Sequence, residues 1–326
     1  MRLAPLILSA LFAWTGAALA DPIRIGMSSS ADPQRSGVYV WLKAFADVLE
    51  KHGQAVVFYP NSALGGEDER IELVRLGLLA VNDTGGNEVA AVSPPYDGLS
   101  LPFLFRDDAE LDKLLHAGRF LARINAEAEP RGVRVVDVAF LGGMSGVFNT
   151  RRPVRTMDEV SRLRLRAMDH RDLTLLSAWG VHGVQVAWEE VPQALGTGIA
   201  EGYMNAPLVP VIFGHTSNIH YFLNLRIQPS VRTITFSQRW YDGLAPPTRR
   251  IVDVAAAQAR AANRRWTAAI QKKEFDILRA HGVTIAEPTP QARAAFVARS
   301  AAIYAQLVTS KAATSVVTDM MKGRKP

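Results

Sequence analysis

The stretch from Pro247 to His281 constrains the fold more than any other part of the chain. Between Pro247 and Gly282 lie 34 residues without a glycine or proline, dense in alanine, arginine, glutamine and lysine. Proline favours the first turn of a helix and glycine favours its end, so we predict one helix over about 247–281. At 1.5 Å per residue it is roughly 50 Å long. Its apolar positions do not keep a heptad register, which disfavours a coiled coil. We therefore predict a helix that spans two domains.

The first twenty residues have the pattern of a secretory signal peptide. Arg2 gives a positive start, an apolar stretch follows, and small residues end at Ala20. A signal peptidase reads this pattern, so cleavage is expected after Ala20. The apolar stretch is too short to span a bilayer, which needs about 20 apolar residues. The chain has no cysteine, so a lipoprotein anchor is excluded. We expect a periplasmic protein.

The rest of the chain alternates strand-like and helix-like segments. Period-two or Val-rich runs predict strands, and apolar residues at helical spacing predict helices between them. This alternation is typical of βαβ units around a mainly parallel sheet, and therefore of an α/β fold. The predicted strands are 23–27, 55–59, 78–81, 133–140, 163–168 and 184–188, and the predicted helices before the long one include 38–49, 67–76, 173–179 and 190–195.

Motifs for catalysis, metals and nucleic acid are absent from the sequence. The glycines of 196–202 resemble a dinucleotide loop, but the third comes one residue late and the loop follows a helix. Val147 replaces the last glycine of a nucleophile elbow. His215 and His220 lie on different helical faces, and the net charge of +6 is scattered along the chain. We predict no catalytic residue, no metal, no cofactor and no nucleic-acid partner.

Four segments together resemble the substrate-binding proteins of tripartite ATP-independent periplasmic (TRAP) transporters, of the dicarboxylate-binding type. Each segment is weakly specific alone, but their order and spacing cover the whole mature chain and precede the long helix. The segments are 59–69 continuing to 74–77, 101–107, 163–168, and 186–191 continuing to 194–202 and Asn205.

The resemblance implies two α/β domains flanking a cleft, similar to type II periplasmic binding proteins. The long helix and the crossovers between domains support both, and the domains close over an organic acid. We predict a signal peptide at 1–20, a first domain at 21–142 plus 231–265, and a second domain at 143–230 plus 266–326.

The resemblance also implies the residues that hold the solute. Arg166 matches the arginine that clamps the solute's carboxylate, and a guanidinium fork suits two carboxylate oxygens. Asn205 matches an amide that contacts the same carboxylate. The alternative is that Asn205 only forms a turn, because asparagine is common in turns. Trp188 matches an aromatic residue of the cleft, with core packing as the alternative.

Three further residues are expected at strand ends. Ser28 follows the first strand, and Glu67 opens a helix where relatives place polar contacts. Glu67 can instead complement the helix dipole. Asp169 follows Arg166 by three residues, and its alternatives are an N-cap or a partner that neutralises Arg166.

One departure concerns a second arginine that many members of the family carry near 145–147. Ser145, Gly146 and Val147 occupy these positions. We hypothesise that the carboxylate grip is weaker, or that it uses Arg171 or Arg232 instead.

The sequence thus predicts a binding protein that delivers a small organic acid to the permease subunits of a TRAP transporter. A monomer is expected, because the protein must shuttle to the membrane. One alternative is a partner that presents its ligand to a sensor, which would use the same closed form. The other is a secreted enzyme acting on a carboxylic acid, for which no nucleophile or base is visible.

Overall fold

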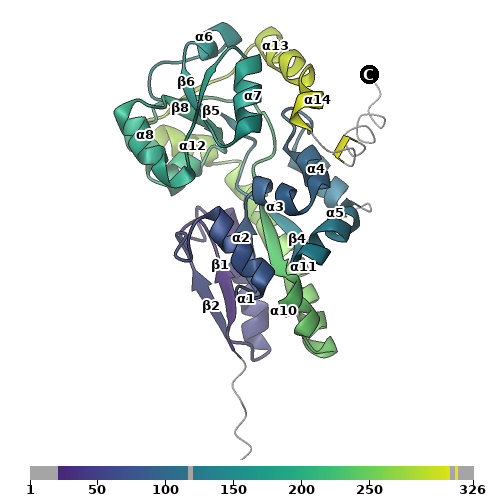
Figure 1. Cartoon of the computed structure of the whole chain (residues 1–326). Helices are drawn as coiled ribbons and strands as arrows, with labels where there is room; N and C mark the ends of the chain where they lie inside the picture. The colour runs from purple at the N-terminus through teal and green to yellow at the C-terminus, as the bar shows by residue number, and fades with distance from the viewer. Residues whose placement is uncertain (1–20, 117–119, 309–312, 315–326) are drawn as a thin grey trace, which may run out of the picture.

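The computed structural model describes residues 21–116, 120–308 and 313–314, and it has two lobes (Figure 1). The predicted signal peptide at 1–20 lies outside the described residues. Each lobe is built on its own mixed sheet, in the orders β2-β1-β3-β10-β4 and β11-β9-β5-β8-β6-β7. Among the described residues no helix combines the length and apolarity needed to cross a bilayer.

The first lobe contains a five-stranded sheet covered by helices on both faces. α1 and α11 pack on one face around Trp41, Phe45 and Phe236, and α2 to α5 cover the other. Its strands are β1 (Ile23–Gly26), β2 (Val56–Tyr59), β3 (Val81–Thr84), β4 (Val133–Phe140) and β10 (Val231–Ser237). Its helices are α1 (Gly37–Lys51), α2 (Glu67–Leu76), α3 (Gly86–Val92), η1 (Pro94–Ser100), α4 (Asp108–His116), α5 (Phe120–Ala128), η2 (Glu129–Arg131), α10 (Gln238–Gly243) and α11 (Pro246–Ile270).

The second lobe repeats this arrangement on a six-stranded sheet. Leu165, Trp179 and Phe296 belong to the core on one face, and Phe148 and Tyr203 to the core on the other. Its strands are β5 (Gly146–Asn149), β6 (Arg164–Ala167), β7 (His182–Gln185), β8 (Gly202–Asn205), β9 (Tyr221–Leu223) and β11 (Thr284–Ala286). Its helices are α6 (Met157–Ser161), α7 (His170–Ala178), η3 (Trp188–Glu190), α8 (Val191–Thr197), α9 (Val209–Ile212), η4 (His215–Ser217), α12 (Glu274–Ala280), α13 (Pro290–Ala301) and α14 (Tyr304–Leu307).

One strand in each sheet departs from the parallel arrangement. β10 is antiparallel to β3 and β4, and β5 is antiparallel to β8 and β9. Both strands come directly after a crossover from the other lobe, so each enters its sheet from the opposite direction. The predicted α/β class is confirmed, with sheets that are mixed rather than mainly parallel.

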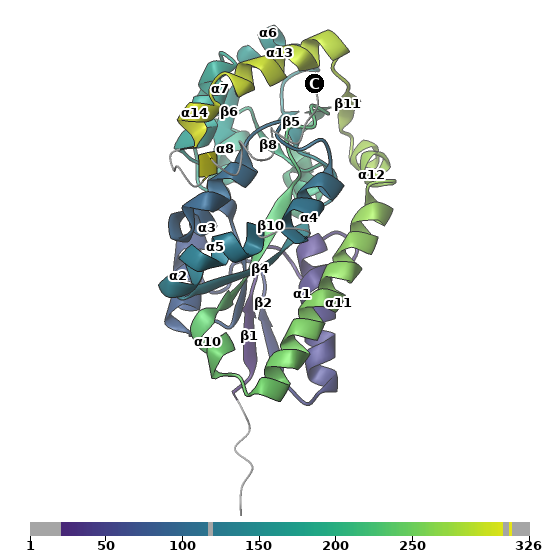
Figure 2. The same ribbon diagram turned by 90° about the vertical axis from the view of Figure 1, so that its right-hand side faces the viewer.

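The long helix is present but shorter than predicted. α11 has 25 residues, about 38 Å, and lies against α1 in the first lobe (Figure 2). A turn at 271–273 separates it from α12, which packs on β11 in the second lobe. Tertiary contacts at the turn account for the break, because the Gly143 N–H donates to Glu274 and the Gln271 amide donates to the Gly142 carbonyl. The two helices together, rather than one helix, therefore connect the lobes.

The connections between the lobes are bonded to one another. The segments that follow β4 and β9 pair through Ser145 N to Gln228 O (2.8 Å), Ile227 N to Ser145 O (2.8 Å) and Leu141 N to Ser230 O (2.9 Å). The α11–α12 turn joins them through the contacts at Gly142 and Gly143. A crossover zone held in this way is the expected site of hinge rotation.

The C-terminal segment differs from the predicted domain division. The sequence placed all of 266–326 in the second domain, but α11 continues to Ile270 in the first lobe. From the end of α14 onward, Leu307, Val308 and Ala313 join the hydrophobic core of the first lobe. The chain therefore crosses between the lobes once more near its C-terminal end. The signal in the sequence is too weak to predict this return, because these few apolar residues form no periodic pattern that would place them in one lobe or the other.

A buried carboxyl group at the hinge gives a testable pH dependence. Glu274 is 4 % exposed, and burial raises its pKa from an ordinary 4.5 to about 7, helped by nearby Asp108. The folded protein therefore binds this proton more tightly than the unfolded chain, and stability falls as pH rises from about 4.5 to about 7. Glu274→Gln should remove that loss of about 2–3 kcal/mol and keep the bond from Gly143.

We expect the melting temperature of Glu274→Gln at pH 8 to exceed that of wild type by roughly 5 °C. The gap should nearly close by pH 4.5 and vanish at lower pH, because the carboxyl is then protonated in the folded protein and increasingly in the unfolded chain. Asp276→Asn, on the same helix but 80 % exposed, is the matched control and should show no such pH-dependent gain. Equal melting curves for wild type and Glu274→Gln at pH 8 would contradict this account.

Candidate functional site

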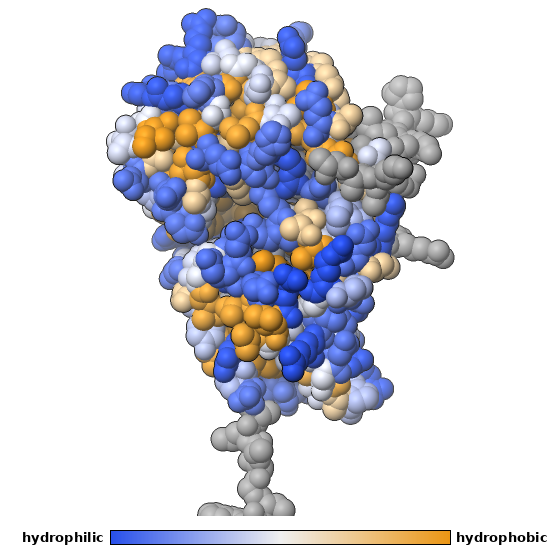
Figure 3. All heavy atoms as spheres, viewed as in Figure 1, coloured by the Kyte–Doolittle hydropathy of each residue, from blue (hydrophilic) through white to orange (hydrophobic). Residues whose placement is uncertain are grey.

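A cavity of about 600 Å³ lies between the two lobes. In Figure 3 the surface is hollowed at this level, between the upper and lower lobes. All six residues that the sequence predicts as solute contacts line this cavity. It lies at the carboxyl ends of β1, β6 and β8, where open α/β sheets place their ligand sites. The six are Ser28, Glu67, Arg166, Asp169, Trp188 and Asn205.

Arg166 comes from the second lobe and is 6 % exposed. Its Nε donates to the Val186 carbonyl oxygen at 2.9 Å, which fixes the plane of the guanidinium. Among the residues that the structure describes, no side chain or carbonyl accepts from its two terminal nitrogens. Burial lowers the pKa of Arg166, and Asp172 and Asp169 oppose that effect. An arginine remains charged in such a site, so its terminal donors are available to an anion in the cavity.

The neighbouring arginines on this strand and before it have partners at the surface. Arg164 donates to the Gly198 carbonyl at 2.7 Å and pairs with Glu201 at 3.4 Å. Arg162 pairs with Asp158 one helical turn away. Arg166 therefore differs from both in its burial and in its unused donors.

An aromatic cluster packs against the guanidinium of Arg166. Its guanidinium carbon lies 5.6 Å from the centre of the Trp188 ring, within the range of a cation–π contact. Trp188 packs edge to face on Phe213 at 4.9 Å and on Tyr203 at 6.1 Å. Tyr203 in turn bonds to His215 at 3.1 Å, and burial lowers the pKa of this histidine to about 4. Trp188 thus has both of the roles considered from the sequence, since it lines the cavity and packs in the core.

Asn205 ends β8 beside the same cavity. Its Oδ1 accepts the N–H of Ala206 at 2.9 Å, which fixes the orientation of the amide. Among the described residues its Nδ2 has no acceptor, so this donor is available to a ligand. Arg166 and Asn205 therefore offer donors from adjacent strands of one sheet.

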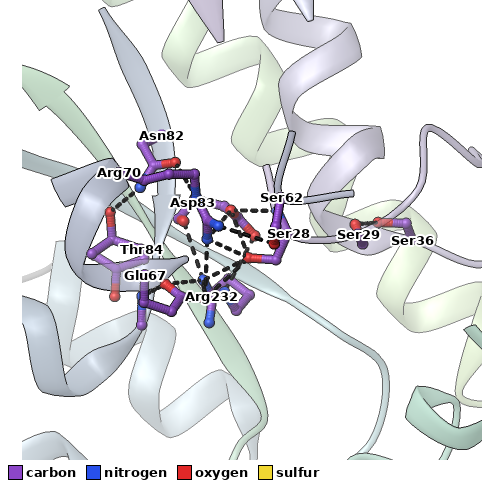
Figure 4. Close-up of polar contacts among 12 residues, drawn as sticks. Ser28, Ser29, Ser36, Ser62, Glu67, Arg70, Asn82, Asp83, Thr84 and Arg232 are labelled. Carbon is purple, nitrogen blue, oxygen red and sulfur yellow. Dashed lines mark hydrogen bonds and ion pairs between the residues drawn. The ribbon is translucent and has the colours of Figure 1, made fainter. Parts of the chain in front are cut away.

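The opposite wall belongs to the first lobe and carries a dense charge network (Figure 4). Arg232 donates to both oxygens of Glu67 at 2.6 and 2.8 Å and to Asp83 Oδ2 at 3.2 Å. The Ser28 hydroxyl bonds to Glu67 and Asp83 at 3.1 and 3.2 Å. Arg70, fully buried, reaches the same hydroxyl at 2.7 Å. The side chains of Ser28 and Glu67 are thus largely occupied by protein partners.

The charges of this network are balanced internally. Burial alone would raise the pKa of Glu67, but Arg232 and Arg70 outweigh it and lower the value. Burial raises the pKa of Asp83, with Arg232 opposing. Burial alone would lower the pKa of Arg232, but Glu67 and Asp83 outweigh that effect and raise the pKa. Arg232 is consequently balanced by carboxylates of the protein.

Asp169 and Arg171 form a second set of polar contacts. Asp169 Oδ1 accepts the N–H of Asp172 at 3.0 Å, which makes it the N-cap of α7, as one of the sequence alternatives proposed. Its Oδ2 accepts from Arg171 Nε at 3.1 Å. Arg171 also donates to Asp97 and Asn87. Like Arg232, Arg171 is paired with carboxylates of the protein.

The structure shows which of residues 145–147, where many members of the family carry a second arginine, face the cavity. Ser145 lines the cavity, and Val147 is fully buried in the second lobe's core. A Cβ at Gly146 would lie 2.3 Å from the Leu223 carbonyl oxygen, so no side chain fits there. Only Ser145 of the three could contact a solute.

Several cavity residues were not predicted from the sequence. Glu88, Tyr96 and Asp97 line the wall of the first lobe with Asp83. Burial raises the pKa of Glu88, and nearby Glu67 raises it further. The sequence signal was available for Asp83, because Asn82-Asp83-Thr84 directly follows an apolar run and is buried at the end of a strand.

A metal centre has no support in this geometry. No group of three histidine or carboxylate side chains in the described parts of the chain is arranged to hold an ion. Among the residues that the structure describes, the cavity instead combines one cation whose terminal nitrogens lack a protein acceptor, an amide donor and a carboxylate-rich opposite wall. Two lobes with such a cleft between them define a solute-binding protein of the two-lobed periplasmic type.

Comparison with known proteins identifies the family. Residues 27–311 match the model of bacterial extracellular solute-binding protein, family 7 (DctP), and the chain belongs to this family. The 2,3-diketo-L-gulonate-binding periplasmic protein of Escherichia coli K12 is 26 % identical over 276 residues, 83 % of this chain and 82 % of that one. The resemblance to TRAP-transporter binding proteins that was drawn from the sequence is thereby confirmed.

Solved structures share the fold. A TRAP periplasmic solute-binding protein from Xanthobacter autotrophicus Py2, with bound β-D-galacturonate, superposes with a TM-score of 0.82 at 22 % identity, over 92 % of this chain and 99 % of that one. One from Sulfurospirillum deleyianum DSM 6946, with bound succinate, has a TM-score of 0.83 at 18 % identity, over 93 % and 99 %. These proteins are named for binding a solute rather than for a reaction.

Proposed function

We propose that the protein captures a small organic acid in the cleft and delivers it to a TRAP-type permease, with Arg166 as the clamp for the carboxylate. The observation that carries this proposal is the pair of terminal nitrogens of Arg166, buried at the cavity and without a protein acceptor among the described residues. A carboxylate matches that fork with two parallel hydrogen bonds. Closure of the cleft expels water and strengthens the contact.

Asn205 and Trp188 complete the grip in this proposal. Asn205 Nδ2 donates to the same carboxylate, and Trp188 holds the guanidinium plane and presents a face to the solute. Asp169 acts as the cap of α7, and Ser28 and Glu67 contact the far end of the solute while remaining in their network. The mature chain is proposed to start after Ala20, to act in the periplasm and to reach the permease as a monomer.

The charges of the cleft favour a solute with one carboxylate and several hydroxyl groups. Arg171 and Arg232 are neutralised, so one cation remains for an anion. The wall opposite Arg166 carries Glu67, Asp83 and Glu88, whose oxygens accept hydrogen bonds from hydroxyl groups, while Arg70 and Arg232 on this wall are already paired and offer a second carboxylate no free cation. The named solutes of the relatives include both hydroxylated acids and succinate, so the chemistry of this wall decides between them.

A thermal-shift panel tests the proposal on residues 21–326 freed of ligand. We expect D-glucuronate, D-galacturonate or D-erythronate to raise the melting temperature, since a ligand at 100 times its dissociation constant adds about 2.7 kcal/mol. D-Glucose, which lacks the carboxylate, and succinate, which carries two, should give no shift. A shift with succinate alone would overturn the solute class but keep the carboxylate clamp. No shift with any acid would contradict the binding function itself.

A further inference from the structure

Arg171 contacts both lobes at once. It lies in the first turn of α7 in the second lobe, whereas Asp97 of η1 and Asn87 of α3 belong to the first lobe. Its Nη1 donates to Asp97 and its Nη2 to Asn87, across 74 and 84 residues of sequence. Figure 1 shows α7 above α3, at the level where the two lobes approach each other.

The contacts of Arg171 occupy four of its five N–H donors, so among the described residues only one N–H of Nη1 lacks a protein acceptor. Its Nε and Nη2 also reach Asp169 Oδ2, each at 3.1 Å. Two carboxylates and one amide therefore surround a single guanidinium. Asp169 comes from the second lobe, and Asp97 and Asn87 come from the first. The side chains of Arg171 and Asp97 are 23 % and 12 % exposed, so the pair is shielded from water on most sides.

We propose that Arg171 links the two walls of the cleft in the closed form and thereby raises the population of the closed form, rather than gripping the solute. The proposal rests on the proposed function only in requiring that the cleft opens and closes. Opening separates Arg171 from Asp97 and Asn87 but leaves its bond to Asp169, which lies on the same lobe. The link therefore contributes only to the closed form, which is the condition for shifting a two-state equilibrium.

The opening equilibrium can be measured without any solute. The chain has no cysteine, so Ala63→Cys in the first lobe and Gln193→Cys on α8 in the second carry the only spin labels. Both positions are exposed. Pulsed electron double resonance then gives the populations of short and long distances between the lobes. Arg171→Ala should lower the ratio of closed to open about three- to tenfold, and Asp97→Ala should lower it similarly.

A double-mutant cycle separates a link from two independent effects. If Arg171 and Asp97 act through each other, the double variant should open no more than Arg171→Ala alone. Arg151→Ala is the matched control, because Arg151 pairs with Glu201 at 2.8 Å within the second lobe. It should leave the distance distribution unchanged.

Two results would overturn the proposal. One is a wild-type distance distribution in Arg171→Ala, and the other is additive opening in the double variant. The affinity for D-glucuronate, or for the acid with the largest thermal shift, tests whether Arg171 contacts the solute directly. If it does, Arg171→Ala should bind the acid more weakly, whereas Asp97→Ala, which frees the guanidinium, should bind it more tightly. A failed thermal-shift panel would leave the distance measurement and its interpretation intact.

Discussion

Replacing Arg166 with methionine is expected to lower the affinity for the bound acid by about 30- to 5,000-fold. Methionine keeps an unbranched side chain over Trp188 but removes the guanidinium, so a carboxylate in the closed cleft loses its charged partner. Losing one member of a buried, hydrogen-bonded charge pair costs about 2–5 kcal/mol. Isothermal titration calorimetry with the acid that gives the largest thermal shift measures this loss directly.

The same variant should keep the fold intact. Arg166 makes a single protein hydrogen bond within the described residues, to Val186, and burial lowers its pKa. A buried cation without a carboxylate bonded to it stabilises a fold little, and a well-packed apolar side chain can replace it at no cost. The urea midpoint of ligand-free Arg166→Met should therefore equal or exceed that of wild type.

Two further variants sharpen the result. Arg164→Met removes a cation two residues away on the same strand, but one that pairs with Glu201 outside the cleft, so affinity should stay at the wild-type value. Arg166→Lys retains the charge but not the planar fork and should have intermediate affinity. Wild-type affinity in Arg166→Met would exclude it as the clamp, and the search would move to Asn205 and Ser145.

The cleft residues that were expected from the sequence came from the resemblance to a family, and local pattern placed them at strand ends. Arg166 lies near the end of a short strand, and Asn205 ends the neighbouring one, so both fall where sheets of this class place a ligand. Ser28 follows β1 for the same reason. Strand ends are recognisable from apolar runs, and the resemblance to a family singled out the residues at these ends as solute contacts.

The partners of the other arginines were not predictable in this way. Arg232 was a candidate for a second cation, but Asp83, which neutralises it, is 149 residues away. Arg171 was the other candidate, and Asp97 lies across the cleft in the other lobe. A single sequence carries no signal for pairs this distant, because only the assembled lobes bring them together.

The break in the long helix has the same origin. Residues 271–273 are all good helix formers, so local propensity predicts continuity. The bond from Gly143 to Glu274 overrides that propensity, and Gly143 belongs to a crossover 131 residues earlier. Propensity is worth tenths of a kcal/mol per residue, whereas a bond from a buried N–H to a carboxylate is worth more.

Replacing Arg232 with methionine is expected to have an effect opposite in kind to the Arg166 variant, with a loss of stability of about 3 kcal/mol or more. Asp83 is 1 % exposed and Glu67 26 % exposed, and both pair with this guanidinium. Its removal leaves two carboxylates at one site with only Arg70 to balance them, and an uncompensated buried charge is strongly destabilising. Urea unfolding of the ligand-free protein should show a clearly lower midpoint.

A compensating variant identifies charge imbalance as the cause. Asp83→Asn in the Arg232→Met background removes the buried carboxylate as well and should recover a substantial part of the lost stability. Arg75→Met is the matched control, since Arg75 pairs with Glu72 at the surface with 44 % and 49 % exposure, and should cost less than 1 kcal/mol. An Arg232→Met protein with wild-type stability but weakened solute binding would mean that Arg232 serves the solute directly, and the cleft would then hold two cations for an acid instead of one.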